Sequence, residues 1–305
     1  MISMETALRW FEASENDLAG APGYPFPRTL SFDALREIAD VIGNPLPFST
    51  LTVGIEKGGV GKSAIAVNLA AFIAARGIRV LVVDFDPQAC ITNFLLPDEV
   101  EYSRLVTLLE IFSVNSRSLG DSALASRIEG VWLIPSKAGI RTIGRTWSGL
   151  QIYEKLCELL DNAHEHFDLI IFDVPPSFSD SVAAAYMVAG LVIIPVIPDI
   201  WTIESIALTL EDIRDTASEW NIRQPDVRIA LNRYNPRRKV GVEGEKLIRE
   251  EYGEILLPVR ISESAFIQNT LNDGLSMLNA GYGKVREEFA SLARLICQTL
   301  QEKQN

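Results

Sequence analysis

Residues 56–63 read Glu56-Lys57-Gly58-Gly59-Val60-Gly61-Lys62-Ser63. Glycines allow a backbone to turn its N–H groups inward around phosphate oxygens, and a helix N-terminus that follows favours bound anions. In such a loop we expect Lys62 to reach the β- and γ-phosphates of a nucleotide and the Ser63 hydroxyl to bind a phosphate-bound Mg²⁺. The stretch therefore predicts a nucleotide phosphate site that uses Mg²⁺.

The segments on both sides of this loop support the prediction. Leu51 to Ile55 is a short apolar run typical of a buried strand. Ala64 to Ala75 is apolar almost all round, as in a buried helix, and Gly77 follows as a stop signal. Because strand, loop and helix follow in the order that a phosphate loop needs, a chance glycine-rich turn is a poor alternative.

A second lysine, Lys57, stands on the entering side of the loop, where the ordinary pattern GxxxxGK[ST] needs none. We expect its side chain to point away from phosphates held by its own loop, although it could reach those of a neighbouring molecule. The stretch KGGVGKS resembles the loop of the ParA/MinD family of deviant Walker ATPases. In that family two subunits sandwich two ATP molecules, and the first lysine contacts the nucleotide of the opposite subunit. The resemblance implies that Lys57 acts across an ATP-dependent homodimer.

The resemblance continues in motif order from about Ser49 to Leu278. Residues 77–88 look like the family's second strand and its DxDPQ segment, in which Asp86 matches the carboxylate held near the attacking water. A carboxylate with an ordinary pKa of about 4 is a weak base, so positioning the water is the favoured role. An acid that stabilises a turn at a strand end is the alternative for Asp86, whereas Asp84 is expected to be structural.

Two further strands end in side chains that the resemblance assigns to the nucleotide. The apolar run 169–172 is followed by Asp173, as in a Walker B strand whose acid orients Mg²⁺, and residues 174–177 look like the family's switch segment. The run 227–231 is followed by Asn232, at the position where family members read adenine with a side-chain amide. A turn or helix cap is the alternative explanation for Asn232.

The predicted site has three groups of residues. The catalytic residues are Lys57, Lys62 and Asp86, the metal ligands are Ser63 and Asp173, and the ATP-binding residues are Lys57, Gly58, Gly59, Val60, Gly61, Lys62, Ser63, Ala64 and Asn232. The implied activity is hydrolysis of ATP to ADP and phosphate, slow and stimulated by a partner protein. The implied cofactors are ATP and Mg²⁺.

The order of apolar strands predicts the fold. Strands at about 51–55, 80–84, 131–134, 169–173, 191–195, 227–231 and 255–257 alternate with helical stretches. This alternation predicts an α/β fold with a mostly parallel twisted sheet covered by helices on both faces. Together with the phosphate loop, the family resemblance implies that this fold is of the P-loop NTPase type. Residues 49–305 form the predicted ATPase domain. Residues 1–48 form an N-terminal extension with one short helix, which either serves as a dimer arm or partner-binding helix or packs on the core; its apolar positions are Phe32, Leu35, Ile38, Ala39 and Ile42.

Composition favours a cytoplasmic protein. The 305 residues are 48% hydrophobic, enough for one large core, and no apolar run reaches the length of about 18 residues that a membrane span needs. The first residues do not resemble a secretory signal. The three cysteines are too few and too far apart for a disulfide framework or a metal knuckle, which argues against the iron–sulfur nitrogenase reductases with a similar loop.

Charge gives conflicting indications about DNA. The formal net charge of −12 disfavours general attraction to nucleic acid. A local basic run follows Asn232, however, and in ParA-type relatives a basic surface of the ATP-bound dimer binds DNA without sequence preference. A solvated loop is the alternative, and Arg260 is the only cation in 260–268, where many DNA-binding relatives have more. The candidate DNA contacts are Arg233, Arg237, Arg238, Lys239 and Lys246.

The combined hypothesis is a nucleoid-associated ParA-like ATPase that positions a plasmid, a chromosomal locus or a protein assembly, with a ParB-like or other adaptor protein as partner. A MinD-like protein that cycles on membranes is one alternative. The last helix, however, mixes acidic and basic residues on its polar face, so core packing explains it better and no membrane contact is expected. A biosynthetic P-loop enzyme, such as an amidating synthetase, is the second alternative; no pocket for an acceptor is evident in the sequence.

Overall fold

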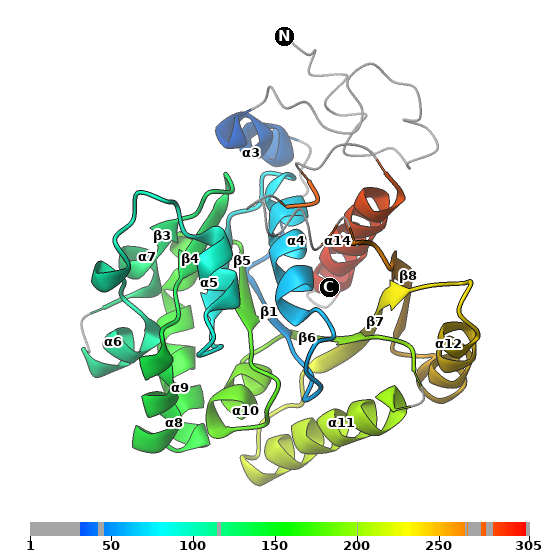
Figure 1. The fold of residues 1–305 in the computed structure, drawn as a ribbon. Coiled ribbons are helices and arrows are strands. Elements are labelled where there is room, and N and C mark those ends of the chain that lie inside the picture. The colour runs from blue at the N-terminus through cyan, green and yellow to red at the C-terminus, as the bar shows by residue number, and fades with distance from the viewer. Residues whose placement is uncertain are drawn as a thin grey trace.

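The computed structural model describes residues 31–41, 46–114, 117–199, 201–265, 267, 276–278 and 283–302. Within these residues the chain forms an α/β fold around an eight-stranded sheet (Figure 1). Its strands are β1 (Ser49–Val53), β2 (Val80–Asp84), β3 (Leu124–Ala125), β4 (Val131–Ile134), β5 (Leu169–Asp173), β6 (Leu191–Val196), β7 (Asp226–Tyr234) and β8 (Leu256–Ser262). The prediction of a mostly parallel sheet is confirmed.

The order of strands across the sheet is β3-β4-β2-β5-β1-β6-β7-β8. Every pairing is parallel except that of β3 with β4, which is antiparallel. The seven predicted strands are all present, with β1 starting and ending two residues earlier than expected. The edge strand β3 was not predicted, because two residues are too few to show a periodic pattern.

Helices cover both faces of the sheet, as predicted (Figure 1). They are α3 (Phe32–Val41), α4 (Lys62–Ala74), α5 (Cys90–Leu95), α6 (Leu108–Ser113), α7 (Leu119–Ser122), α8 (Ile143–Thr146), α9 (Gly149–Asp161), α10 (Asp180–Met187), α11 (Thr202–Glu219), α12 (Lys239–Tyr252) and α14 (Lys284–Glu302), with short 3₁₀ helices η1 (Tyr102–Arg104), η2 (Ala138–Thr142) and η3 (Ala163–Glu165). Because strand side chains alternate between faces, Ile171 packs in the cluster of α4 and α14, while Ile170 and Phe172 pack in that of α9, α10 and α11.

The C-terminal helix α14 packs beside α4 on one face of the sheet (Figure 1). The rings of Phe72 and Phe289 stack with their centroids 6.3 Å apart. The apolar face of α14 is buried in the core, as predicted; it comprises Phe289, Leu292, Ala293, Ile296, Cys297 and Leu300. Across the described ranges, none of the helices combines the length and the hydropathy that crossing a membrane requires.

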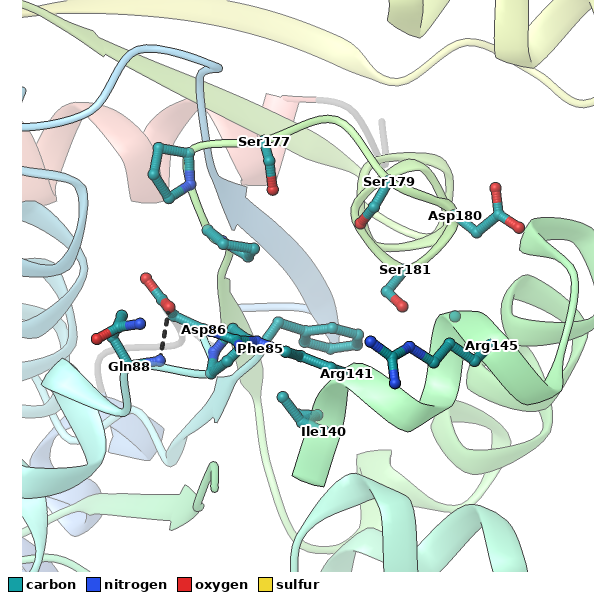
Figure 2. Close-up of a pocket in the computed structure, with 14 residues that line it drawn as sticks. Phe85, Asp86, Gln88, Ile140, Arg141, Arg145, Ser177, Ser179, Asp180 and Ser181 are labelled. Carbon is teal, nitrogen blue, oxygen red and sulfur yellow. Dashed lines mark hydrogen bonds between the residues drawn. The ribbon is translucent and has the colours of Figure 1, made fainter. Parts of the chain in front are cut away.

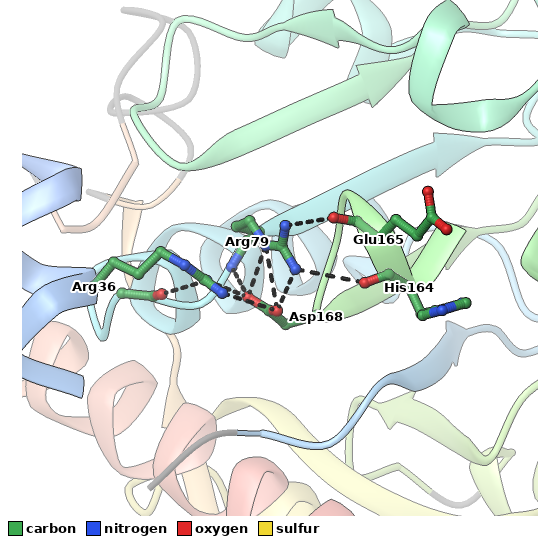
Figure 3. A network of polar contacts seen from close by, with 6 residues as sticks. Arg36, Arg79, His164, Glu165 and Asp168 are labelled. Atoms are coloured by element: carbon green, nitrogen blue, oxygen red, sulfur yellow. Dashed lines mark hydrogen bonds and ion pairs between the residues drawn. The ribbon is translucent and has the colours of Figure 1, made fainter. Parts of the chain in front are cut away.

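Helix α3 of the N-terminal extension docks on the core through a close backbone approach and an ion-pair network. Gly77 has a φ of 78°, and a Cβ there would lie 2.7 Å from the carbonyl oxygen of Leu35, so only glycine fits beneath the helix. Arg36 Nη1 donates to Asp168 Oδ2 at 2.7 Å, and Arg79 Nη2 donates to Asp168 Oδ1 at 2.8 Å (Figure 3). Core packing of the predicted helix is therefore observed. Ile42 and residues 1–30 lie outside the described residues.

The Asp168 network gives a prediction about stability. Burial acts to raise the pKa of Asp168, but hydrogen bonds from Arg79 and Arg36 outweigh it and hold the pKa below the ordinary value. Asp168→Asn should lower the free energy of unfolding at neutral pH by about 2 kcal/mol, because two partly buried guanidinium groups lose their anionic partner. Urea unfolding monitored by circular dichroism measures this change.

The same network predicts a pH dependence with a definite sign. Because the pKa of Asp168 is lower in the folded state, its contribution is complete above the unfolded value of about 3.9 and is lost as the pH falls through the folded value. The difference between wild type and Asp168→Asn should therefore shrink below about pH 4. Asp98→Asn is the control, since it breaks an exposed pair with Arg127 and should cost less than about 1 kcal/mol. Equal costs for the two variants would contradict the role of Asp168.

Candidate functional site

The site lies at the carboxyl ends of the central parallel strands. Strand β1 lies between β5 and β6, and the loop after it, residues 54–61, leads directly into α4. The register pairs Val53 with Asp173 and Asp84 with Asp173, so the predicted strand-end acids are neighbours at the same edge. In an open α/β sheet this edge is where ligands bind.

The glycine-rich loop has the backbone that a phosphate cradle needs. Gly59 and Gly61 have φ values of 73° and 90°, in the left-handed region that favours glycine. Lys62, only 7% exposed, begins α4 and donates from Nζ to the carbonyl oxygen of Lys57 at 3.2 Å, across the loop. Burial lowers the pKa of Lys62, although the charges of Asp173 and Asp86 oppose this effect. The loop therefore combines a backbone of the phosphate-cradle type with a buried cation whose Nζ lies across it.

Ser63 and Asp173 form the oxygen pair that Mg²⁺ would require. Ser63 Oγ donates to Asp173 Oδ2 at 2.7 Å. The other oxygen, Asp173 Oδ1, is buried and has no hydrogen-bond partner among the described residues. A hydroxyl beside an unsatisfied carboxylate oxygen, next to a phosphate cradle, fits a hard cation that keeps most of its water shell. These two residues are thus suited to hold Mg²⁺, directly or through water.

Asp84 shapes the turn that follows β2. Its Oδ2 accepts hydrogen bonds from Thr92 Oγ1 at 2.6 Å and Thr92 N at 3.0 Å, and its Oδ1 accepts one from Asp86 N at 2.9 Å. Burial raises the pKa of Asp84 to about 7 despite these bonds. Burial, with the nearby charge of Asp84, also raises the pKa of Asp173. Asp84 therefore has the structural environment that was expected of it. A bound cation would reduce the electrostatic repulsion between the carboxylates of Asp84 and Asp173.

Asp86 lies half-buried at the mouth of the loop. Its Oδ1 accepts the backbone N–H of Gln88 at 2.8 Å, and its charge acts on the nearby Lys62. The carboxylate is thus oriented beside the phosphate cradle, where it could accept a hydrogen bond from a water molecule.

Lys57 is directed away from its own phosphate cradle, towards the start of α11. Its Nζ lies 2.8 Å and 3.0 Å from the two carboxylate oxygens of Asp199 and 3.3 Å from Thr202 Oγ1. Asp199 also accepts the backbone N–H of Trp201 at 2.9 Å. Burial acts to raise the pKa of Asp199, but hydrogen bonds from Lys57 and Thr202 outweigh it and lower the pKa.

Asn232 contacts the phosphate loop itself. It is 4% exposed, and its Nδ2 donates to the carbonyl oxygen of Val60 at 2.7 Å. A Cβ on Gly61 would lie 2.5 Å from the same Nδ2, so this glycine is also needed for the close approach. The structure brings Asn232 together with the loop, while its predicted contact with adenine stays a prediction.

Comparison with known proteins identifies the family of this chain. The profile of a family described as an AAA domain matches residues 49–224. The chromosome-partitioning ATPase Soj of Thermus thermophilus is 30% identical over 222 residues, which cover 71% of this chain and 84% of Soj. The chain belongs to the ParA family of P-loop ATPases.

Two solved structures have a similar fold. Apo McdA from Cyanothece superposes with a TM-score of 0.71 at 24% identity, covering 81% of this chain and 99% of McdA. Cobyrinic acid a,c-diamide synthase from Mycobacterium smegmatis, solved with an ATP analog and magnesium, has a TM-score of 0.68 at 20% identity, covering 83% of this chain and 96% of the synthase. At these identities the likeness shows the fold alone.

The predicted DNA contacts of this ParA-family chain are exposed but partly neutralised. Arg238 pairs with Glu263 at 3.2 Å, Lys239 with Glu243 at 3.5 Å and Lys246 with Glu250 at 3.6 Å. The sequence shows no acid within the run 233–239, but the fold brings Glu263 beside Arg238, and Glu243 and Glu250 lie one turn after Lys239 and Lys246 on α12. The local positive charge is therefore weaker than the sequence implies.

Asp199 and Thr202 are the residues of this ParA-family site that sequence reasoning missed. They hold Lys57 from a strand end that carries no recognised motif. The position of Asp199 could have indicated its role. Asp199 follows the buried strand β6, and the carboxyl end of β6 lies beside that of β1. An acid at the end of β6 is therefore a candidate ion-pair partner for Lys57, which lies at the start of the loop after β1.

Proposed function

We propose that this ParA-family chain is an ATPase that dimerises around ATP and Mg²⁺, with Lys57 reaching the nucleotide of the opposite subunit. The observation that carries the proposal is the direction of Lys57, whose Nζ lies at Asp199 rather than in its own cradle. Lys62 already occupies that cradle. Because Lys57 does not contact the phosphate site of its own loop, its charge is available to neutralise the phosphates bound to a second subunit.

Within this proposal Asp86 positions the attacking water and Asn232 binds adenine. Lys62 and the loop N–H groups stabilise charge that develops on the transferred phosphoryl group. Ser63 and Asp173 hold Mg²⁺, which would neutralise phosphate charge when bound. Hydrolysis is slow in the isolated protein and is stimulated by a ParB-like or other adaptor protein.

We further propose that the ATP-bound dimer binds DNA without sequence preference and so associates with the nucleoid. Arg233 and Arg237 are exposed and make no ion pair with any described residue; Arg238 and Lys239 belong to the same run, and Lys246 follows on α12. A dimer would present two such patches, and each phosphate contact adds a counterion-release contribution. The cargo that this cycle positions is a plasmid, a chromosomal locus or a protein assembly.

Retention of the protein on DNA in three nucleotide states tests the proposal. We expect retention with a non-hydrolysable ATP analogue and Mg²⁺, and little retention with ADP or without nucleotide, because only the dimer joins two weak patches. Retention should fall steeply with salt concentration. Equal retention in all three states would contradict the cycle, and ATP-dependent binding to anionic liposomes without binding to DNA would favour the membrane alternative.

Lys57→Ala is the variant that separates nucleotide binding from dimerisation in this experiment. It should bind ATP with an affinity within about threefold of wild type, yet remain a protomer in analytical ultracentrifugation and lose retention on DNA. Lys284→Ala, which removes an exposed lysine that pairs with Glu288 on α14, is the matched control and should behave as wild type. Normal association of Lys57→Ala would exclude the trans role.

A further inference from the structure

A pocket of about 490 Å³ opens beside Asp86, in the size range of small-molecule sites (Figure 2). Three segments that are distant in sequence form its walls. They are the turn after β2 (residues 85–88), the segment after β5 (residues 175–181) and the run of η2 and α8 (residues 140–145). The pocket therefore contacts both loops that carry the strand-end acids of the ATP site.

Two arginines supply the positive charge of this pocket. Arg141 and Arg145 lie four residues apart in the helical run 138–146, and both line the pocket. Both are exposed, and neither guanidinium group makes an ion pair or hydrogen bond with any described residue. Like charges at this spacing repel each other. An anion bound between them would remove that repulsion.

The two acids that line the pocket, Asp86 and Asp180, do not pair with its arginines. Asp86 accepts the Gln88 N–H, and its charge acts on Lys62 at the ATP site. In Figure 2 the side chain of Arg145 extends towards Ser181 and Phe85, whereas the carboxylate of Asp180 points away from the guanidinium group. The arginine end of the pocket is thus a separate region of positive charge.

The rest of the lining favours an organic anion over a bare inorganic one. Buried Phe85 and Ile140, with Pro175 and Pro176, give an apolar wall. The hydroxyls of Ser177, Ser179 and Ser181 provide further hydrogen-bond donors. Gly144 also lines the pocket and leaves it open on this side, since a Cβ there would lie 3.3 Å from Ser181 Oγ.

We propose that this pocket binds a small organic anion, one that carries a carboxylate or phosphate group on an apolar body. The anionic group lies between Arg141 and Arg145, and the apolar body packs on Phe85 and the two prolines. Because the ligand contacts the loops that carry Asp86 and follow Asp173, it changes the rate of ATP hydrolysis. That last consequence rests on the proposed ATPase function, whereas binding itself does not.

Titration of the full chain with phenyl phosphate and with benzoate tests the proposal. The protein is saturated with ADP and Mg²⁺ so that the phosphate loop is occupied, and binding is followed by calorimetry and by ligand-observed NMR. We expect saturable binding of at least one probe, and Arg141→Gln/Arg145→Gln should weaken it at least about tenfold, since two charge-assisted contacts are lost. Phenyl phosphate binding alone would identify a phosphate ligand, and benzoate binding alone a carboxylate ligand.

The matched control is Arg104→Gln/Arg214→Gln, which removes two exposed arginines outside the pocket. It should bind the probes as wild type does. ADP affinity, measured for each protein, separates this proposal from the ATPase proposal, because it should be unchanged in both double variants. Absence of binding by both probes at millimolar concentrations, or equal binding by the pocket variant and wild type, would overturn the proposal.

Discussion

Asp86→Asn should lower the rate constant for ATP hydrolysis by about 10²–10³-fold and change the dissociation constant for ATP by less than about threefold. The carboxylate is held by the backbone N–H of Gln88 at the mouth of the loop. Asparagine preserves its size but replaces one acceptor oxygen with a donor, so a water molecule is no longer held for attack. The ground-state contacts of the nucleotide with the glycine-rich loop remain.

Phosphate release in a single turnover with saturating ATP and Mg²⁺ measures this change, and calorimetry measures ATP affinity. The control is Asp121→Asn on α7, which alters an exposed acid bonded to Ser118. It should turn over at the wild-type rate. Loss of ATP affinity that matches the loss of turnover would show that Asp86 binds the nucleotide instead of acting on the water.

Lys62→Ala should raise the dissociation constant for ATP by about 100-fold, which corresponds to about 2.7 kcal/mol. Lys62 is the cation inside the cradle, and its buried amine loses solvation that phosphate oxygens would replace. Its Nζ donates a hydrogen bond to the Lys57 carbonyl oxygen, and a bound phosphate would replace this neutral acceptor with a charged one.

Titration calorimetry with a non-hydrolysable ATP analogue measures the affinity of this variant. Lys62→Met serves as a companion, because it keeps the volume of the buried stem and removes only the charge. Both variants should lose affinity to a similar extent, while thermal unfolding confirms that each is folded. Binding that is weakened by Lys57→Ala but not by Lys62→Ala would reverse the assignment of the two lysines.

The strands of the sheet and the phosphate loop could be predicted from the sequence, because both depend on local patterns. Apolar strand runs and the glycine positions between Gly58 and Ser63 encode backbone geometry directly. The acid at the end of β5 could be matched for the same reason, since the strand that precedes Asp173 is continuous and buried. Element boundaries were less predictable, as the two-residue shift of β1 shows.

The remaining features depend on contacts between distant segments, which periodicity does not report. Asp199 lies 142 residues from Lys57, and the pocket between Asp86 and Arg145 combines three segments. For the basic run 233–239, the sequence led to an overestimate of the local positive charge. The run had no acid within its own sequence, yet Glu263 lies beside Arg238 in the fold. Charge read along a chain is thus a poor guide to charge on a surface.

The ion pair between Lys57 and Asp199 has a consequence for how reversible subunit pairing is. In the proposed dimer, Lys57 would have to leave Asp199 before it contacts the nucleotide of the second subunit, so dimerisation would exchange one anionic partner of this lysine for another. With side chains 26% and 29% exposed, the internal pair is worth about 1 kcal/mol or less. In the proposed dimer, loss of the terminal phosphate would remove the competing anion, and Asp199 would be available to pair with the Lys57 amine again. Asp199 would therefore favour separation of the subunits after hydrolysis.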